Sequence, residues 1–169
     1  PRVRLWRADG DGRPLGLSRI DPLKWLGRFG PAMEEVVHAT GHEHVTAEHT
    51  STLELTSDDF LTPAGDCILG IEADRVPAEF DPGFVAACQS ADVTVTATLE
   101  ADGHEAVVTG RGDPDLTFAG DRSLVVRTSD YVDDRTVLVG ADAAAADVDR
   151  RLVDALADGA DLTLTLAVE

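Results

Sequence analysis

Short segments in which apolar and polar residues alternate make up most of the chain after residue 33. In the clearest of them, every second residue from Val93 to Leu99 is apolar and the residues between them are threonines. A period of two places the two sets on opposite faces of a β-strand. We expect further strands at residues 35–39, 45–56, 67–73, 104–109, 123–128, 135–140 and 162–168.

Two helices are expected between these strands. Asp81 followed by Pro82 is typical of a helix N-cap and first turn, and predicts a short helix through Cys88. Asp142 is expected to cap a long helix over residues 143–157, because the apolar residues there recur at helical spacing. Arg150 and Arg151 would then be solvated in the middle of this long helix.

The order of these elements predicts a mainly β fold. Asp102-Gly103 is a hairpin signal, and strands that recur at short, regular spacing favour an antiparallel sandwich or barrel with one short and one long helix at an edge. We find no internal repeat in the pattern. Strict βαβ alternation is also absent, and no helix follows Gly110-Arg111-Gly112, so a doubly wound nucleotide-binding fold is disfavoured.

Composition excludes several classes of protein. No run of about 18 apolar residues exists, so we expect no membrane-spanning helix and no membrane partner. The hydrophobic content of 43% is too high for a fully disordered chain. Two cysteines are too few for a disulfide scaffold.

The net charge of −18 is divided unevenly along the chain. Residues 1–32 carry 7 basic and 3 acidic residues, whereas residues 33–169 carry 7 basic and 29 acidic residues. No lysine follows Lys24. Such a surface repels itself in dilute buffer, but at about 1 M salt the Debye length is only about 3 Å. We therefore expect a cytoplasmic protein of a salt-loving archaeon, in which acidity is no argument against a nucleic-acid partner.

The same change in composition suggests a domain boundary. We expect residues 1–32 to be a non-native or mis-called N-terminal extension, with a real basic arm as the alternative. Residues 33–169, which begin at the single methionine, are expected to form one β-sandwich domain.

Histidines close together offer a candidate metal site. On a strand, His42 and His44 would project to one face, which suits two ligands of one metal ion. Imidazole suits divalent Zn, Cu, Fe or Ni, and the third ligand would be Asp66, Cys67 or His49. The alternative is a set of exposed or hydrogen-bonded histidines in a pair of strands.

Asp66 and Cys67 lie where a predicted turn enters a strand. A Cys67 thiolate would act as a nucleophile if His42 or His49 served as its base. A plainer interpretation fits better, in which Cys67 is a small buried apolar side chain and Asp66 caps the turn.

Arg127 and Arg135 are conspicuous because a strand-borne arginine in so acidic a chain implies a partner. Asp66 or Asp130 would supply a buried bidentate ion pair with the guanidinium group. A ligand phosphate or carboxylate would serve equally well chemically. We favour the ion pair.

Taken together, these segments resemble an archaeal family, domain of unknown function 371, from about Met33 to Glu169. The matching residues are Gly41-His42, Val45-Thr46-Ala47, His49, Thr52-Leu53-Glu54, Leu61-Thr62, Gly65-Asp66-Cys67-Ile68, Gly70, Arg127, Ser129-Asp130, Arg135-Thr136 and the stretch from Ala145 to Arg150. The resemblance implies a compact sandwich of jelly-roll type in a cytosolic archaeal protein, and it implies no activity. The family usually has asparagine at the position of His44, which weakens a metal site built on the pair His42 and His44.

We therefore expect a small binding module for an anionic ligand, such as a nucleotide, or for an RNA phosphate. The candidate binding residues are His42, His49, Asp66, Cys67, Arg127, Asp130 and Arg135. Two alternatives stay open. One is a metal-dependent enzyme with His42 and His49 as ligands of a divalent metal, and the other is a structural interaction domain. The sequence assigns neither catalytic residues nor an oligomeric state.

Overall fold

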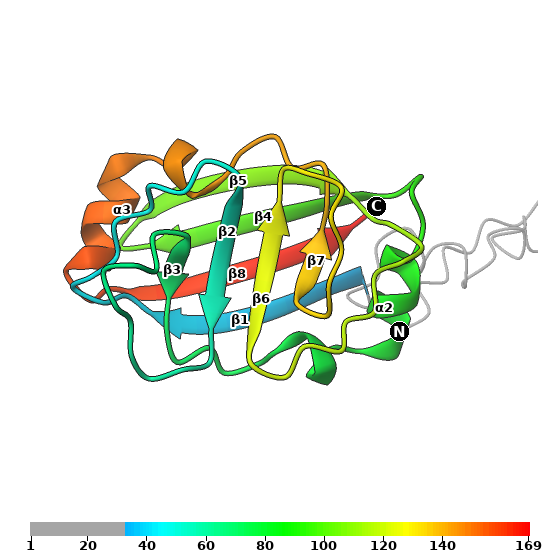
Figure 1. Cartoon of the computed structure of the whole chain (residues 1–169), viewed down its shortest axis with the longest axis horizontal. Coiled ribbons are helices and arrows are strands. Elements are labelled where there is room, and N and C mark those ends of the chain that lie inside the picture. Colours follow the sequence, from blue (N-terminus) through cyan, green and yellow to red (C-terminus); the bar gives the residue numbers. More distant parts are fainter. Residues whose placement is uncertain (1–32) are drawn as a thin grey trace, which may run out of the picture. The chain divides into compact units, whose positions relative to one another are not determined.

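Residues 33–169 are described by a computed structural model, in which two four-stranded sheets enclose one hydrophobic core (Figure 1). The expectation for residues 1–32 lies outside the described residues. The large sheet has the order β1-β8-β4-β5, and the small sheet has the order β3-β2-β6-β7. The strands are β1 (Glu34–Thr40), β2 (Thr52–Thr56), β3 (Ile68–Gly70), β4 (Thr94–Ala101), β5 (His104–Arg111), β6 (Ser123–Arg127), β7 (Thr136–Leu138) and β8 (Asp161–Val168).

The predicted mainly β class is confirmed, with one difference in how the strands pair. The large sheet is antiparallel throughout, as expected. In the small sheet, β2 pairs with β3 and β6 pairs with β7 in parallel. The connections after β2 and β6 are long enough to return the chain to the same end of the sheet, which a two-residue hairpin cannot do. A jelly roll is antiparallel, so these two pairs depart from that topology.

Two α-helices and two 3-10 turns lie between the strands, and all four are short. They are η3 (Pro77–Glu79), α2 (Pro82–Cys88), η4 (Ala145–Asp147) and α3 (Arg150–Ala157). Asp81 caps α2 as predicted, because its carboxylate accepts hydrogen bonds from two backbone N–H groups. No helix in residues 33–169 has the length and apolar character needed to cross a membrane.

The prediction of one long helix over residues 143–157 is wrong. The Asp147 carboxylate accepts a hydrogen bond from the backbone N–H of Ala144 and closes a separate 3-10 turn. The cap of α3 is Asp149. Arg150 is therefore the first residue of α3 and not a mid-helix residue. It is exposed, as expected, and its guanidinium group also donates to backbone carbonyls including those of Thr46 and Ala47.

Residues 34–101 (the first half) and residues 104–168 (the second half) repeat one plan. Each half runs through three strands, a 3-10 turn, an α-helix and a fourth strand. In each sheet the two halves contribute two strands apiece. They meet at the centre of the small sheet, at β2 and β6, whereas in the large sheet strands of the two halves alternate, with β4 and β8 at the centre. The expectation of no internal repeat is therefore wrong.

Equivalent backbone hydrogen bonds support this repeat. In the first half, the Asp74 N–H donates to the His38 carbonyl, and the Asp74 carboxylate accepts from the His38 N–H at 2.8 Å. In the second half, Asp142 makes the same two bonds with Thr109, and its carboxylate accepts at 2.9 Å. Each aspartate thereby ties an outer strand of the large sheet to the loop that leaves the small sheet.

The two halves also exchange hydrogen bonds with each other. The Ala78 N–H of the first half donates to the Gly120 carbonyl of the second, and the Ala146 N–H of the second donates to the His49 carbonyl of the first, both at 2.9 Å. Because these bonds cross between the halves, neither half has its complete set of backbone partners alone.

Candidate functional site

The outer face of the small sheet carries polar and charged side chains from β2 and β6. Leu53 and Leu55 of β2 point into the core, so the alternating polar residues of β2 face outward. The pairing of β2 with β6 sets the outward residues opposite one another as Thr52 with Arg127, Glu54 with Val125, and Thr56 with Ser123.

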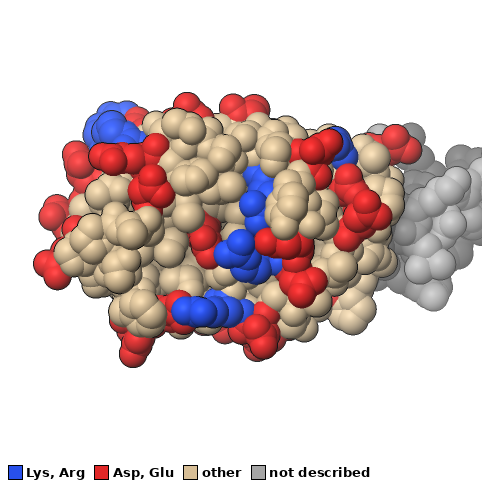
Figure 2. All heavy atoms as spheres, in the orientation of Figure 1, with Lys and Arg blue, Asp and Glu red and all other residues tan. Residues whose placement is uncertain are grey.

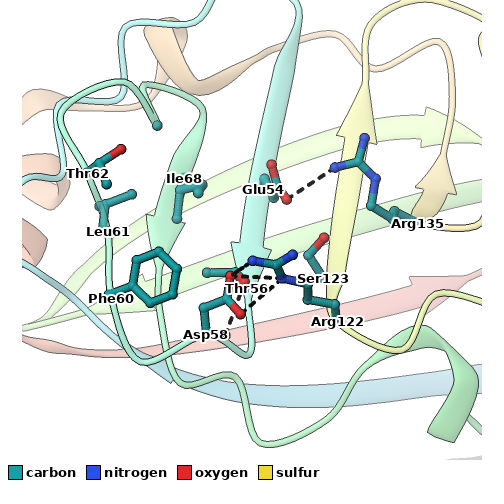
Figure 3. Close-up of a pocket in the computed structure, with 11 residues that line it drawn as sticks. Glu54, Thr56, Asp58, Phe60, Leu61, Thr62, Ile68, Arg122, Ser123 and Arg135 are labelled. Carbon is teal, nitrogen blue, oxygen red and sulfur yellow. Dashed lines mark hydrogen bonds and ion pairs between the residues drawn. The ribbon is translucent and has the colours of Figure 1, made fainter.

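A cleft of about 370 Å³ opens on this face (Figure 3). Its floor includes Glu54 and Thr56 of β2. One side is apolar, and the other carries two arginines. The lining residues are Glu54, Thr56, Asp58, Phe60, Leu61, Thr62, Gly65, Ile68, Arg122, Ser123 and Arg135.

Arg122 is held at the edge of the cleft by Asp58. Its Nε lies 3.0 Å from both carboxylate oxygens, and its Nη2 lies 2.7 Å from Oδ2. The hydrogen bond from Arg122 is the main cause of the lowered pKa of Asp58. Nη1 of Arg122 has no hydrogen-bond partner within residues 33–169, and the side chain is 65% exposed. The guanidinium group is thus oriented and still has a free N–H edge.

Arg135 extends over the middle of the cleft toward Glu54. Its Nη1 lies 3.5 Å from Oε1 of Glu54, while its Nη2 lies 3.2 Å from a carboxylate oxygen of Asp133. The second oxygen of Glu54 accepts a hydrogen bond from the Cys67 thiol at 3.2 Å. Glu54 therefore lies between one cationic and one neutral neighbour.

The environment of Cys67 argues against the nucleophile interpretation. Burial, followed by the charge of Glu54, raises the pKa of the thiol to about 12. A nucleophilic cysteine needs the opposite shift, because the thiolate is the reactive form. Cys67 is half-buried and acts here as a hydrogen-bond donor.

Arg127 is more enclosed than the other two arginines on this face. Its Nε donates to the Thr136 hydroxyl at 2.8 Å, its Nη2 donates to Asp133 at 2.9 Å, and its guanidinium carbon lies 4.8 Å from the centre of the Tyr131 ring. The predicted partners Asp66 and Asp130 are wrong, because the loop after β6 brings Asp133 into reach instead.

The histidines lie in turns, where their rings accept hydrogen bonds from the backbone. Nδ1 of His49 accepts from the N–H groups of Ser51 and Thr52 at 3.2 and 3.1 Å. Nδ1 of His42 accepts from the His44 N–H at 3.0 Å, and those two rings lie 5.2 Å apart. The strand predicted over residues 45–56 is therefore shorter, because the chain turns until Thr52.

A metal site at these histidines gains no third ligand from the structure. Across residues 33–169, no group of three His, Cys, Asp or Glu side chains is arranged to hold a metal ion. Asp66 takes part in the turn through its carbonyl, which accepts from the N–H groups of Glu48 and His49. The metal-ligand role of His42 and His49 stays a prediction.

The predicted binding residues do not converge on one cavity. Of the seven, only Arg135 lines the cleft. Cys67 donates to the lining residue Glu54, and Arg127 shares the Asp133 carboxylate with Arg135. The other four, which are His42, His49, Asp66 and Asp130, are not among the lining residues. Sequence reasoning missed Asp58 and Arg122, although Arg122 is one of only 7 basic residues after residue 33 and could have been noticed for its rarity.

The charge on this face is mixed. Figure 2 shows basic side chains in the middle of the face, with acidic side chains beside them. Three arginines lie here, Arg122, Arg127 and Arg135, and each is paired with a carboxylate. The carboxylates hold the guanidinium groups in fixed positions, an arrangement that suits bidentate recognition of an anion.

Comparisons with known proteins give a family and a relative. The family model described as "Domain of unknown function (DUF371)" matches residues 37–169. An uncharacterized protein of Methanocaldococcus jannaschii is 35% identical over 136 residues, which are 80% of this chain and 100% of that protein. Both descriptions leave the activity open, so a function has to be argued from the site.

Proposed function

The chain belongs to the DUF371 family, and we propose that it is a binding module for a phosphate-bearing ligand of nucleotide type. The ligand lies in the cleft on the outer face of the small sheet. The observation that carries this proposal is the concentration of three arginines, out of 7 basic residues in residues 33–169, on that one face.

The charge distribution supports an anionic ligand at this place. Residues 33–169 carry 29 acidic residues, which repel anions over most of the surface. At the cleft, Arg122 and Arg135 offer guanidinium N–H donors on side chains that are 65% and 47% exposed. Guanidinium groups match the geometry of phosphate oxygens, so a phosphate is the anion that this wall fits best.

The apolar side of the cleft supports a ligand that also carries a flat ring. Phe60 is 55% exposed, which is unusual for so large a hydrophobic residue, and it stands beside Leu61 and Ile68 (Figure 3). A volume of about 370 Å³ is within the range of small-molecule sites. A ring against Phe60 and a phosphate against the arginines together describe a nucleotide.

We also propose the cytoplasm of a salt-loving archaeon as the setting of the protein. The excess of aspartate and the lack of lysine after Lys24 support this, and so does the archaeal relative. Melting temperatures measured in dilute buffer and at about 2 M KCl test the proposal. Screening of the acidic surface should raise the midpoint in KCl, and an unchanged or lower midpoint contradicts it.

Calorimetric titration of the full chain tests the binding function. The probes are inorganic phosphate and the four common ribonucleoside monophosphates at one fixed salt concentration. Binding should weaken about tenfold in Arg122→Ala and in Arg135→Ala, because each loses a charge-assisted contact to phosphate. Arg151→Ala is the matched control, since Arg151 is an exposed arginine paired with Asp149, away from the cleft.

Absence of binding by all five probes to the intact chain contradicts the proposal. The paired arginines would then serve only to hold the loops of the small sheet, as in a structural interaction domain. Weakening by Arg151→Ala equal to that by Arg122→Ala would contradict the position of the site.

A further inference from the structure

Two exposed aromatic side chains follow the two central strands of the small sheet. Phe60 is 55% exposed and Tyr131 is 60% exposed, whereas the other phenylalanines of residues 33–169 are buried. Each ring comes four residues after the end of its strand, which is Thr56 for β2 and Arg127 for β6. Because β2 and β6 pair in antiparallel fashion, these strand ends lie at opposite ends of the sheet. The repeat of the two halves therefore places one exposed ring at each end.

The ring of Tyr131 rests on a fixed cation of the outer face. The guanidinium carbon of Arg127 lies 4.8 Å from the ring centre. Arg127 is only 9% exposed and donates hydrogen bonds to Thr136 and Asp133, so it cannot move away easily. Since one face of the ring is covered by Arg127, the exposed part of Tyr131 is the opposite face. Aromatic rings with one open face are the surfaces on which the bases of single-stranded nucleic acids stack.

Three guanidinium groups lie between the two rings. Arg122 directly precedes β6 and Arg127 ends it, so their Cα atoms are about 16 Å apart at the rise of a β-strand. Arg135 lies beside the middle of β6, because its carbonyl accepts from the Val125 N–H. Figure 2 shows basic side chains following one another across the middle of this face. The three cations thus form a row along β6.

Each arginine of this row keeps one nitrogen free for a ligand. Within residues 33–169, the side-chain hydrogen bonds of all three arginines use Nε and Nη2, and Nη1 makes none. Thr46 Oγ1 is the one fully buried side-chain polar atom without a hydrogen bond in that part of the chain. Nη1 of the enclosed Arg127 therefore still reaches solvent. The carboxylates fix the guanidinium groups without using all of their donors.

We propose that the ligand of this face is a short single-stranded oligonucleotide that runs along β6. One base stacks on Phe60, another stacks on Tyr131, and phosphates between them meet the arginines. This inference rests on the proposed nucleotide-binding function and extends the ligand beyond one nucleotide. A mononucleotide brings one ring and one phosphate, whereas the face offers two rings and three guanidinium groups. Stacking is valuable here because salt weakens contacts to phosphate.

Calorimetry with the full chain at one fixed salt concentration tests the length of the ligand. The probes are AMP, the single-stranded tetranucleotide tetra-adenylate and inorganic tetraphosphate. Tetra-adenylate should bind at least about tenfold more tightly than AMP, because a second stacked base adds about that factor. Inorganic tetraphosphate carries charge and no ring, so it should bind at least about tenfold more weakly than tetra-adenylate.

A second comparison changes the ring that lies outside the cleft. Tyr131→Ala should reduce the ratio of tetra-adenylate to AMP affinity about tenfold, and Tyr131→Phe, which keeps the ring, should preserve it. Val107→Ala is the matched control, because Val107 is a 51% exposed apolar residue of β5 in the large sheet. This control should leave the ratio unchanged.

Equal affinities of the intact chain for AMP and tetra-adenylate overturn the oligonucleotide ligand and leave the nucleotide-binding function standing. Binding of tetraphosphate as tightly as tetra-adenylate overturns the stacking of bases on the two rings. Failure of all three probes to bind overturns both proposals. The comparison of ligands decides the matter even if Tyr131→Ala does not fold.

Discussion

The two halves of the protein share a backbone plan and differ in the side chains that they place on the outer face of the small sheet. The Glu54 N–H donates to the Cys67 carbonyl in the first half, as the Val125 N–H donates to the Arg135 carbonyl in the second. Cys67 and Arg135 therefore occupy equivalent positions. The repeated bonds build the scaffold, and the site is located where the halves differ.

Two further pairs of positions show the same difference. The Thr56 carbonyl accepts from the Ala73 N–H, as the Arg127 carbonyl accepts from the Ala141 N–H. In the same way, Ser51 corresponds to Arg122, since each accepts a backbone N–H from the strand beside it. All three arginines of the face belong to the second half, so the first half supplies the apolar wall and the second half supplies the cations.

The largest effect is expected at a pair of equivalent glycines, Gly41 and Gly112. A Cβ at Gly41 would lie 2.0 Å from the Leu156 carbonyl oxygen, and one at Gly112 would lie 2.1 Å from that of Cys88. Because backbone atoms cannot move aside easily, Gly41→Ala and Gly112→Ala should each destabilise the fold by about 3 kcal/mol. Denaturant unfolding measures both. A clearly smaller loss in one half would contradict equivalent packing.

The next effect should separate the halves. Arg127→Ala removes one hydrogen-bond partner of Thr136 and one of Asp133. It should cost about 2 kcal/mol, because Thr136 keeps its bonds to Asp133 and Asp133 keeps Arg135. The equivalent change Thr56→Ala removes one hydroxyl that accepts from the Asp58 N–H, and should cost about 1 kcal/mol. Unfolding free energies measure both. Equal losses would show that Arg127 contributes no more than its counterpart.

A smaller and symmetric effect is expected at Asp74 and Asp142. Each carboxylate accepts the N–H of an outer strand of the large sheet. Asp74→Ala and Asp142→Ala should each cost about 1 kcal/mol, while the asparagine variants, which keep an acceptor, should lose less. Thermal unfolding under one set of conditions compares the four variants. Unequal losses of stability in Asp74→Ala and Asp142→Ala would show that the two halves share the backbone plan but not the energetic contribution of these side chains.

The smallest effect concerns acid stability. Hydrogen bonds from the Arg151 side chain, and next from its backbone N–H, lower the pKa of Asp149 from 3.8 to about 2. The unfolded chain therefore takes up this proton at a higher pH, so the stabilisation is complete above about pH 4 and is lost as the pH falls toward 2. The melting temperature of the unaltered chain should fall further between pH 4 and pH 2 than that of Asp149→Asn, and identical slopes would contradict this.

Local signals in the sequence predicted much of the fold. The alternation at residues 92–101, the hairpin at Asp102-Gly103 and the cap at Asp81 each depend on neighbouring residues, and the structure contains all three. The prediction of one long helix over residues 143–157 was wrong, because helical spacing of apolar residues also fits a 3-10 turn followed by a short helix. The competing hydrogen bonds of Asp147 and Asp149 decided between these possibilities.

The repeat of the two halves is visible in the sequence only as a few matching dipeptides, which are less conspicuous than the alternation of the strands. Ala-Asp occurs at residues 73–74 and 141–142, and an alanine followed by an acidic residue occurs at 78–79 and 146–147. These residues make the equivalent turns of the two halves. Most other equivalent positions differ in side chain, because one backbone plan accepts many sequences where a side chain is exposed.

The sequence by itself determined the class of the fold and most of the strands. It also determined the hairpin turn at Asp102 and the helix cap at Asp81. The small number of basic residues after residue 33 singled out the arginines as candidate site residues. Only the tertiary structure decided which carboxylates the arginines meet and that Glu54, Arg122 and Phe60 share one cleft. The physical reason is that a strand pattern fixes the face on which a side chain lies, whereas its partner depends on the pairing of strands and loops far apart in the chain.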